Sequence, residues 1–110
     1  MILKHNHIRC KAIRDAANGE DCTICESQDN TVVFCHLNES WAGKGMGIKA
    51  CDLAGFFGCR KCHSEYDTPG SALSMDHWEI MRAMYRTWKR LWERGIIGEI
   101  KYMSNLKKEM

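Results

Sequence analysis

The chain of 110 residues has room for one domain with one modest core, and its hydrophobic fraction of 45% is that of an ordinary globular protein. No apolar run approaches the roughly 18 residues that a membrane-spanning helix needs. The first nine residues are largely polar and lack the apolar segment of a secretory signal. We therefore expect one cytoplasmic domain over residues 1–110 that spans no membrane.

The net charge of +2 is unevenly distributed along the chain. Residues 1–19 hold four bases and one acid, residues 20–75 hold four bases and eight acids, and residues 76–110 hold eight bases and five acids. Basic ends suit contact with a phosphate backbone, and an acidic middle suits a divalent cation. A solvated surface of mixed charge gives the same balance, so both interpretations stay open.

The first half of the chain predicts short elements separated by loops. Residues 9–17 favour a short helix that ends at Asn18-Gly19, a pair suited to a left-handed helix terminus. Residues 31–36 are rich in β-branched and aromatic side chains, which predicts a strand. A glycine-containing loop is expected over residues 37–51. After Cys59 a short helix is expected to run to about Tyr66.

The second half predicts one long helix after the break around Pro69. The helix runs from about Ser74 to Arg94 within an amphipathic segment 74–97, capped by Ser74 or Asp76 and ended by Gly95. Residues 98–110 are expected to form a tail. One apolar face follows the helical period and is expected to be core: Met81, Met84, Tyr85, Trp88, Leu91 and Trp92. Basic residues on the other faces are expected either to contact a DNA backbone or to form an ordinary solvated surface: Arg82, Arg86 and Lys89.

Two CxxC pairs are the strongest chemical signal in the sequence. Zinc prefers four soft ligands in a tetrahedron, and Cys22-x-x-Cys25 with Cys59-x-x-Cys62 supplies four thiolates. Seven cysteines are an odd number, and a reducing compartment disfavours disulfides, so metal ligation explains the excess better. A closed site of four cysteines leaves no open position, so we expect a structural zinc. The remaining cysteines are expected to be free: Cys10, Cys35 and Cys51.

Two of the five histidines are placed for chemistry. His36 ends the strand between the CxxC pairs, and His63 follows Cys62 directly. Neighbouring helical positions point about 100° apart, so Cys62 can face the zinc while His63 faces elsewhere. Because side chains alternate along a strand, Cys35 points away from His36. The remaining histidines are expected to be structural: His5, His7 and His77.

The order CxxC, strand histidine, acid and CxxCH resembles the HNH nucleases, and most closely the phage and prophage Ref-like (YbcO-like) nucleases of that superfamily. The stretch 13–22, Ile-Arg-Asp-Ala-Ala-Asn-Gly-Glu-Asp-Cys, is similar to that family's Leu-Arg-x-Ala-Ala-x-Gly-x-x-Cys opening. Residues 33–37 resemble its Val-Leu-Ala-His-Ile strand, and residues 59–67 its CxxCHxExD segment. Residues 84–87 resemble its Met-x-Arg-Thr helix. The resemblance covers roughly residues 13–97.

This resemblance implies a fold and a role for each matching residue. The fold would be α+β, with a zinc-stapled ββα-metal core over residues 13–67 and a long C-terminal helix. His36 would be the general base, and His63 would bind a catalytic divalent cation, magnesium or manganese. Asp52, at the supporting asparagine position of HNH enzymes, would orient His36 or bind the cation itself.

Three departures from the family pattern bear on the cation site. The first cysteine pair is a tight CxxC, whereas the nearest relatives space it more widely. Cys35 stands where many HNH enzymes carry an aspartate, and a thiol is a poor ligand for a hard cation. Asp52 stands in place of asparagine, a change that Ref-like members share. The last two departures leave the ligands of the catalytic cation open.

Together these features predict a metal-dependent endonuclease that hydrolyses DNA in phage recombination or DNA processing, a context given by the resemblance alone. A recombinase filament is a candidate partner, and the oligomeric state stays open. The alternative is a zinc-stabilised module that binds DNA or protein without cutting. It explains the cysteines and basic ends equally well but leaves His36 and His63 without a role. A thiol redox protein would need a reactive CxxC at a helix start within a βαβ frame, which the sequence lacks.

Overall fold

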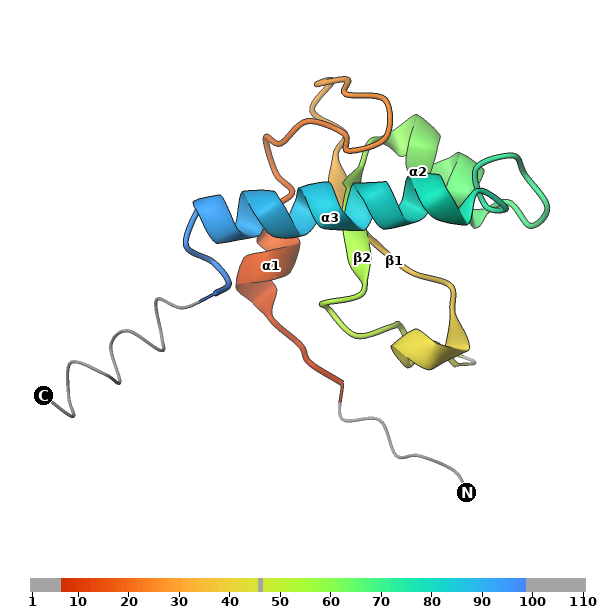
Figure 1. Ribbon diagram of the computed structural model, residues 1–110, viewed down its shortest axis with the longest axis horizontal. Coiled ribbons are helices and arrows are strands. Elements are labelled where there is room, and N and C mark those ends of the chain that lie inside the picture. Colours follow the sequence, from red (N-terminus) through yellow and green to blue (C-terminus); the bar gives the residue numbers. More distant parts are fainter. Residues whose placement is uncertain (1–6, 46, 99–110) are drawn as a thin grey trace, which may run out of the picture.

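The computed structural model describes residues 7–45 and 47–98 (Figure 1). Two antiparallel strands lie at its centre and helices pack around them, which makes the protein a small α+β fold. The elements in chain order are α1 (Lys11–Asp15), β1 (Val33–His36), the 3-10 turn η1 (Ser40–Ala42), β2 (Gly55–Gly58), α2 (Arg60–Asp67) and α3 (His77–Glu93).

The two strands form a hairpin-like ladder in which Val33 pairs with Gly58 and His36 pairs with Gly55. β2 was not predicted from the sequence, because Gly-Phe-Phe-Gly shows no alternation of apolar and polar residues. All four of its residues are buried, since α3 packs on this strand and crosses the sheet (Figure 1). A Cβ on Gly55 would lie 2.5 Å from the Cys35 carbonyl oxygen, so the close strand pairing requires glycine there.

The predicted capping residues of the long helix are confirmed, although the helix is slightly shorter at both ends than predicted. Asp76 rather than Ser74 is the cap, and its Oδ1 accepts a hydrogen bond of 3.0 Å from the Glu79 amide. The chain leaves α3 through Gly95, whose φ of 71° is in the left-handed region. The first helix is shorter than the predicted 9–17, because turns replace the helical bonds after Asp15.

The predicted core face of α3 was wrong. The buried residues of this helix are Ile80, Ala83, Thr87 and Leu91. Of the six residues expected to be core, only Leu91 is buried and Met84 is half-buried, while the others are exposed: Met81, Tyr85, Trp88 and Trp92. The reason is close packing on β2. Small Ala83 and Thr87 let the helix approach the strand, and the Thr87 hydroxyl accepts a 3.0 Å hydrogen bond from the Phe57 amide.

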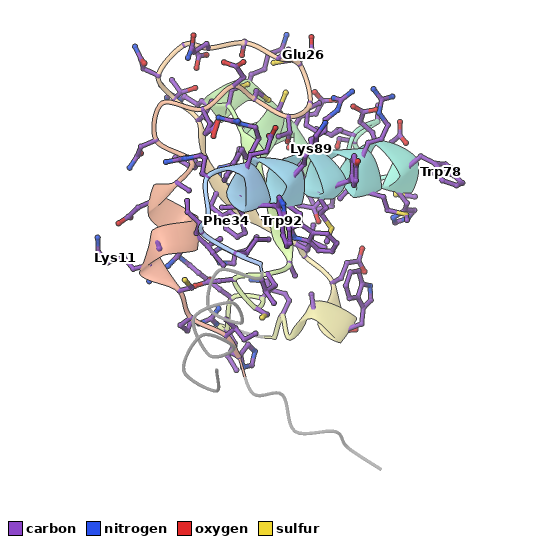
Figure 2. All side chains as sticks on the ribbon, turned by 60° about the vertical axis from the view of Figure 1, so that its left-hand side comes forward. Lys11, Glu26, Phe34, Trp78, Lys89 and Trp92 are labelled. Carbon is purple, nitrogen blue, oxygen red and sulfur yellow. The ribbon has the colours of Figure 1, made fainter. Side chains whose placement is uncertain are left out.

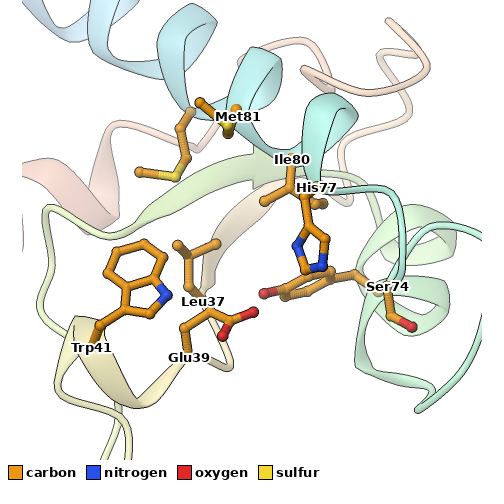
Figure 3. Close-up of a pocket in the computed structure, with 9 residues that line it drawn as sticks. Leu37, Glu39, Trp41, Ser74, His77, Ile80 and Met81 are labelled. Atoms are coloured by element: carbon orange, nitrogen blue, oxygen red, sulfur yellow. The ribbon is translucent and has the colours of Figure 1, made fainter.

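This reversal is testable with two adjacent residues on α3. Ile80 is 7% exposed and Met81 is 60% exposed, and both line a cavity of about 240 Å³ between α3 and the loop after β1 (Figure 3). Ile80→Ala should lower the free energy of unfolding by about 2–4 kcal/mol, because it removes buried methylenes and leaves a void. Met81→Ala should cost about 0.5 kcal/mol or less. Urea unfolding measures both, and equal losses would contradict this packing.

Two sequence expectations concern segments outside the described residues. His5 and most of the predicted tail, residues 99–110, lie there. Within residues 7–45 and 47–98, no helix is both long and apolar enough to cross a membrane.

Candidate functional site

The four cysteines of the two CxxC pairs lie together in space. Cys22 and Cys25 come from the turn before β1, while Cys59 and Cys62 bracket the start of α2. Their four sulfur atoms lie within 4.8 Å of one another, and the Cys25 and Cys59 sulfurs are 3.6 Å apart. A tetrahedron with Zn–S bonds of about 2.3 Å has edges of roughly 3.8 Å. The cluster therefore has the size of a four-cysteine zinc site.

The surroundings of these sulfurs favour thiolate ligands. The amides of Ile24 and Cys25 point at the Cys22 sulfur, at 3.4 and 3.5 Å. The Ser27 hydroxyl lies 3.1 Å from the Cys25 sulfur, and this hydrogen bond is the largest cause that lowers the pKa of Cys25 to about 6. Burial acts in the opposite direction and raises the pKa of Cys62 above its ordinary value. Donors directed at the sulfurs, together with four soft ligands, fit a metal such as zinc.

The other three cysteines stand apart from this cluster. None of Cys10, Cys35 and Cys51 is in a disulfide, as the sequence predicted, and none belongs to the group of four. Cys35 is fully buried on the sheet face opposite to His36. Burial raises the pKa of Cys35 to about 12, so its sulfur stays a protonated thiol. It is therefore unsuited to bind a hard cation.

His36 is paired with Asp52, which the sequence placed as its partner or as a cation ligand. The His36 Nε2 atom lies 2.7 Å from Asp52 Oδ1. The second carboxylate oxygen accepts a 2.7 Å hydrogen bond from the Cys10 amide and lies 3.2 Å from Arg14 Nε. The Phe34 ring meets the imidazole edge-on at a centroid distance of 5.0 Å. Between them, the carboxylate and this ring hold the imidazole in one orientation.

An open cavity of about 340 Å³ lies beside this pair, lined by Arg9, Arg14, His36, Gly47, Ile48, Lys49 and Asp52. Three of the lining residues are permanently basic, and the single acid among them is 1% exposed and already paired. The Arg9 guanidinium is fixed by the carbonyl of Lys49, at 2.7 Å, and lies 3.4 Å from Asp52 Oδ1. A cavity with this charge and a histidine in its wall is suited to a phosphate group.

Asp52 stays ionised although it is buried. Burial alone would raise its pKa. The hydrogen bonds from His36 and the Cys10 amide, with the positive charges of His36 and Arg14, outweigh burial and hold the pKa of Asp52 below its ordinary value. An ionised carboxylate accepts a hydrogen bond from the Nε2–H of His36 and thereby fixes the tautomer of the imidazole.

The lowered pKa of Asp52 predicts a defined loss of stability in acid. A carboxylate whose folded pKa lies below its unfolded value, about 3.9, contributes stability that is present above pH ~4–5 and is lost as the pH falls through the folded pKa. Asp52→Asn should therefore be less stable than wild type at pH 7, and the difference should shrink steadily below about pH 5. Urea unfolding from pH 7 to pH 3 measures it, with the exposed Asp21→Asn as control. A difference that stays constant with pH would contradict the shift. Thiolates release zinc when they are protonated in acid, so the difference is read only at pH values at which both proteins still contain one zinc per chain.

His63 lies on α2 and not in the His36 cavity. Its Nε2 is 3.1 Å from Oδ2 of Asp67, one helical turn later. The other Asp67 oxygen accepts a 3.1 Å hydrogen bond from the side-chain amide of Asn38. The His36 cavity does not include His63 among its lining residues. The structure therefore brings His36 together with Asp52, and places His63 in a separate group with Asp67 and Asn38.

The basic residues of α3 divide by role. Arg86 donates a 2.8 Å hydrogen bond to the Thr23 carbonyl, which makes it a brace between α3 and the first CxxC turn. Arg82 is exposed and lies 3.6 Å from Glu79. Lys89 is exposed and has no ion pair with another residue that the structure describes. Of the three, Arg82 and Lys89 are the two whose exposed side chains can reach a phosphate.

Three residues of the His36 cavity and the His63 group were not predicted as site residues from the sequence: Arg9, Arg14 and Asp67. Arg9 and Arg14 were counted only as charge at the basic N-terminal end. No local signal singled them out, because positions five residues apart on a helix point about 140° away from each other. The signal for Asp67 was its i+4 spacing from His63 on a helix.

Comparison with known proteins identifies one similarity. The model of a family described as "Putative nuclease YbcO" matches residues 11–96. The match includes the cysteine cluster, Asp52, both candidate histidines and all of α3. No curated protein and no solved structure shows a significant match to the chain.

Proposed function

Because the chain belongs to the family described as "Putative nuclease YbcO", we propose that it is a metal-dependent endonuclease of the HNH type that hydrolyses DNA phosphodiester bonds, in phage recombination or DNA processing. The observation that carries the proposal is the 2.7 Å pair of His36 and Asp52 in a basic cavity. The succession β1, β2, α2 supports the ββα arrangement that the resemblance implies.

His36 acts as the general base in this proposal. Its Nε2–H donates to Asp52, which leaves Nδ1 as the nitrogen that accepts a proton from the attacking water. Asp52 remains ionised and stabilises the imidazolium that forms, as a buried carboxylate does in other histidine-dependent hydrolases. Arg14 and Lys49 hold the scissile phosphate in the cavity and offset its negative charge.

His63 and Asp67 are the proposed ligands of the catalytic cation. An imidazole nitrogen and a carboxylate oxygen, 3.1 Å apart and half-exposed, offer two ligands to a divalent cation, and the carboxylate is the one that suits magnesium or manganese. The lining of the His36 cavity does not include these two residues, so the phosphate would have to extend from that cavity to the cation, which would then stabilise the charge on the phosphate and on the leaving oxygen. The zinc held by the four cysteines would be structural, because it fixes the start of α2 and hence the position of His63.

The proposal is tested by incubating labelled single-stranded, duplex and branched DNA with the protein and magnesium or manganese, with and without a recombinase filament. Wild type should cut at least one of these substrates, and only with the added cation. His63→Ala should cut about 10²-fold more slowly at low cation concentration and recover partly when the cation is raised, because a ligand is lost. Lys61→Ala, an exposed change on the same helix, is the control.

The informative result is the combination of binding and cleavage. A wild-type protein that binds DNA but cuts none of these substrates would support the alternative of a zinc-stabilised binding module. Cleavage by His63→Ala that is equal to wild type at every cation concentration would remove His63 from the cation site.

A further inference from the structure

A row of large side chains lies exposed along α3. We call it the α3 ridge, and it consists of Trp78, Met81, Tyr85, Trp88 and Trp92. Spacings of three and four residues place all five on one line of the helix. Trp78 is 80% exposed and Tyr85 is 64% exposed. In Figure 2, Trp78 projects beyond the start of the helix into solvent.

The composition of the α3 ridge points to a particular kind of partner. A contiguous exposed apolar surface marks an interaction site, and four of these five side chains are aromatic. Flat aromatic rings stack on nucleobases whatever the base sequence. Rings that are free on one face are therefore suited to unpaired bases, whereas the bases of a duplex are stacked on one another and present only their edges.

The charge beside the ridge fits a phosphate backbone. Arg82 and Lys89 each follow a ridge residue directly and are seven residues apart, so they lie along one side of the row. The two acids of α3 are each paired with an arginine, Glu79 with Arg82 and Glu93 with Arg90. Arg86 is turned toward the first CxxC turn, where it donates to the Thr23 carbonyl. Among the described residues, the positive charge left over beside the rings is therefore that of Lys89, while Arg82 adds a guanidinium that it shares with Glu79.

The same charge disfavours a second copy of the chain as the occupant. If two ridges packed antiparallel, Arg82 of one copy would lie near Lys89 of the other, and like charges at a helix interface repel. A strand of nucleic acid has the opposite charge and neutralises both residues. The ridge is anchored to the loop before β2, because the Trp88 indole donates a 3.1 Å hydrogen bond to the Leu53 carbonyl.

We propose that the α3 ridge binds single-stranded nucleic acid, with bases stacked on Trp78, Tyr85 and Trp92 and phosphates held by Arg82 and Lys89. This inference rests on the proposed function, which it deepens by naming the unpaired strand as the substrate class. Trp88 is held in place by its hydrogen bond to the Leu53 carbonyl.

Binding is measured by fluorescence anisotropy with a labelled single-stranded oligonucleotide and with its duplex, without added magnesium or manganese, so that nothing is cut. The decisive variants are matched pairs at the two most exposed aromatic positions of the α3 ridge. Trp78→Leu and Tyr85→Leu keep an apolar side chain but lose the ring, and should each raise the single-strand Kd about 5- to 10-fold. Trp78→Phe and Tyr85→Phe keep a ring and should stay within about 2-fold of wild type.

Charge and oligomeric state complete the test. Lys89→Gln should reduce the slope of log Kd against log salt by about one, and the exposed Lys11→Gln should leave it unchanged. Leucine variants that bind as wild type, or tighter binding of the duplex, would overturn the inference while leaving any cleavage activity intact. Sedimentation of wild type as a dimer that the leucine variants disrupt would assign the ridge to a second copy instead. If wild type binds single strands in the expected pattern but cuts nothing, the proposed nuclease function is wrong and the inference that the α3 ridge binds single strands is supported.

Discussion

Replacing Cys59 with serine should unfold the protein at 25 °C and abolish its zinc content. Structural zinc sites contribute about 10 kcal/mol or more to folding, which equals or exceeds the whole stability of a small domain, about 5–15 kcal/mol. Cys59 is 2% exposed, and its sulfur is one of the four that lie within 4.8 Å of one another. A chelator strong enough to remove zinc should have the same effect on wild type, and added zinc should restore the fold.

The matched control is Cys51→Ser, because Cys51 is half-buried and lies outside the cluster. It should keep one zinc per chain and lower the melting temperature by a few degrees at most. The measurements are metal content by mass spectrometry and thermal unfolding by circular dichroism. A Cys59→Ser protein that is folded and melts like wild type would show that the cluster does not hold the fold.

The cysteine cluster was fully predictable because its signal is local and chemical. Two CxxC turns each place two sulfurs close together whatever the rest of the chain does, and a tetrahedral metal site requires all four at one point. The strand at β1, the helix at α2 and the cap of α3 were predictable for the same reason. Each depends on residues that are near one another in the sequence, such as Asp76 and Glu79.

The buried face of α3 could not be predicted because two competing faces follow the helical period. Large apolar residues define one face and form the exposed ridge, while Ala83 and Thr87 are part of the face that packs on β2. From the sequence, the larger side chains of the first face favoured it as the buried face. In the fold the second face is buried, because its small side chains let the helix lie close to β2, a strand that begins and ends with glycine. Helical periodicity also does not distinguish an apolar face that packs in the core from one that binds a partner.

The surroundings of His36 were predictable only in part. The resemblance placed Asp52 next to His36, and the structure pairs the two at 2.7 Å. Arg9 and Arg14 are separated from Asp52 by about forty residues of chain, so no local pattern connects them. Long-range ion pairs of this kind depend on how the α1 segment docks beside β1, which the sequence alone does not specify.

His36→Ala should abolish cleavage while leaving the fold and the zinc content unchanged. Loss of a general base typically reduces the rate about 10²–10⁴-fold, and raising the cation should not restore it, because the proton acceptor is missing and not a ligand. His36 is half-buried at the end of β1, and among the residues that the structure describes its ring nitrogens have one hydrogen bond, to Asp52, so the variant loses that one side-chain hydrogen bond. The rates to compare are single-turnover cleavage of the best substrate at low and high cation concentration.

Two variants separate a base from a structural histidine. His77→Ala, at the exposed start of α3 and outside the His36 cavity, should cleave at the wild-type rate. Asp52→Asn should retain measurable cleavage but at a reduced rate, because Nε2 loses the ionised partner that stabilises the imidazolium. Imidazole added to His36→Ala should restore part of the rate, since a free base can enter the open cavity of about 340 Å³. Cleavage by His36→Ala at the wild-type rate would leave the nuclease proposal standing and assign the base to another residue, and the His36–Asp52 pair would then serve only to hold β1 beside α1.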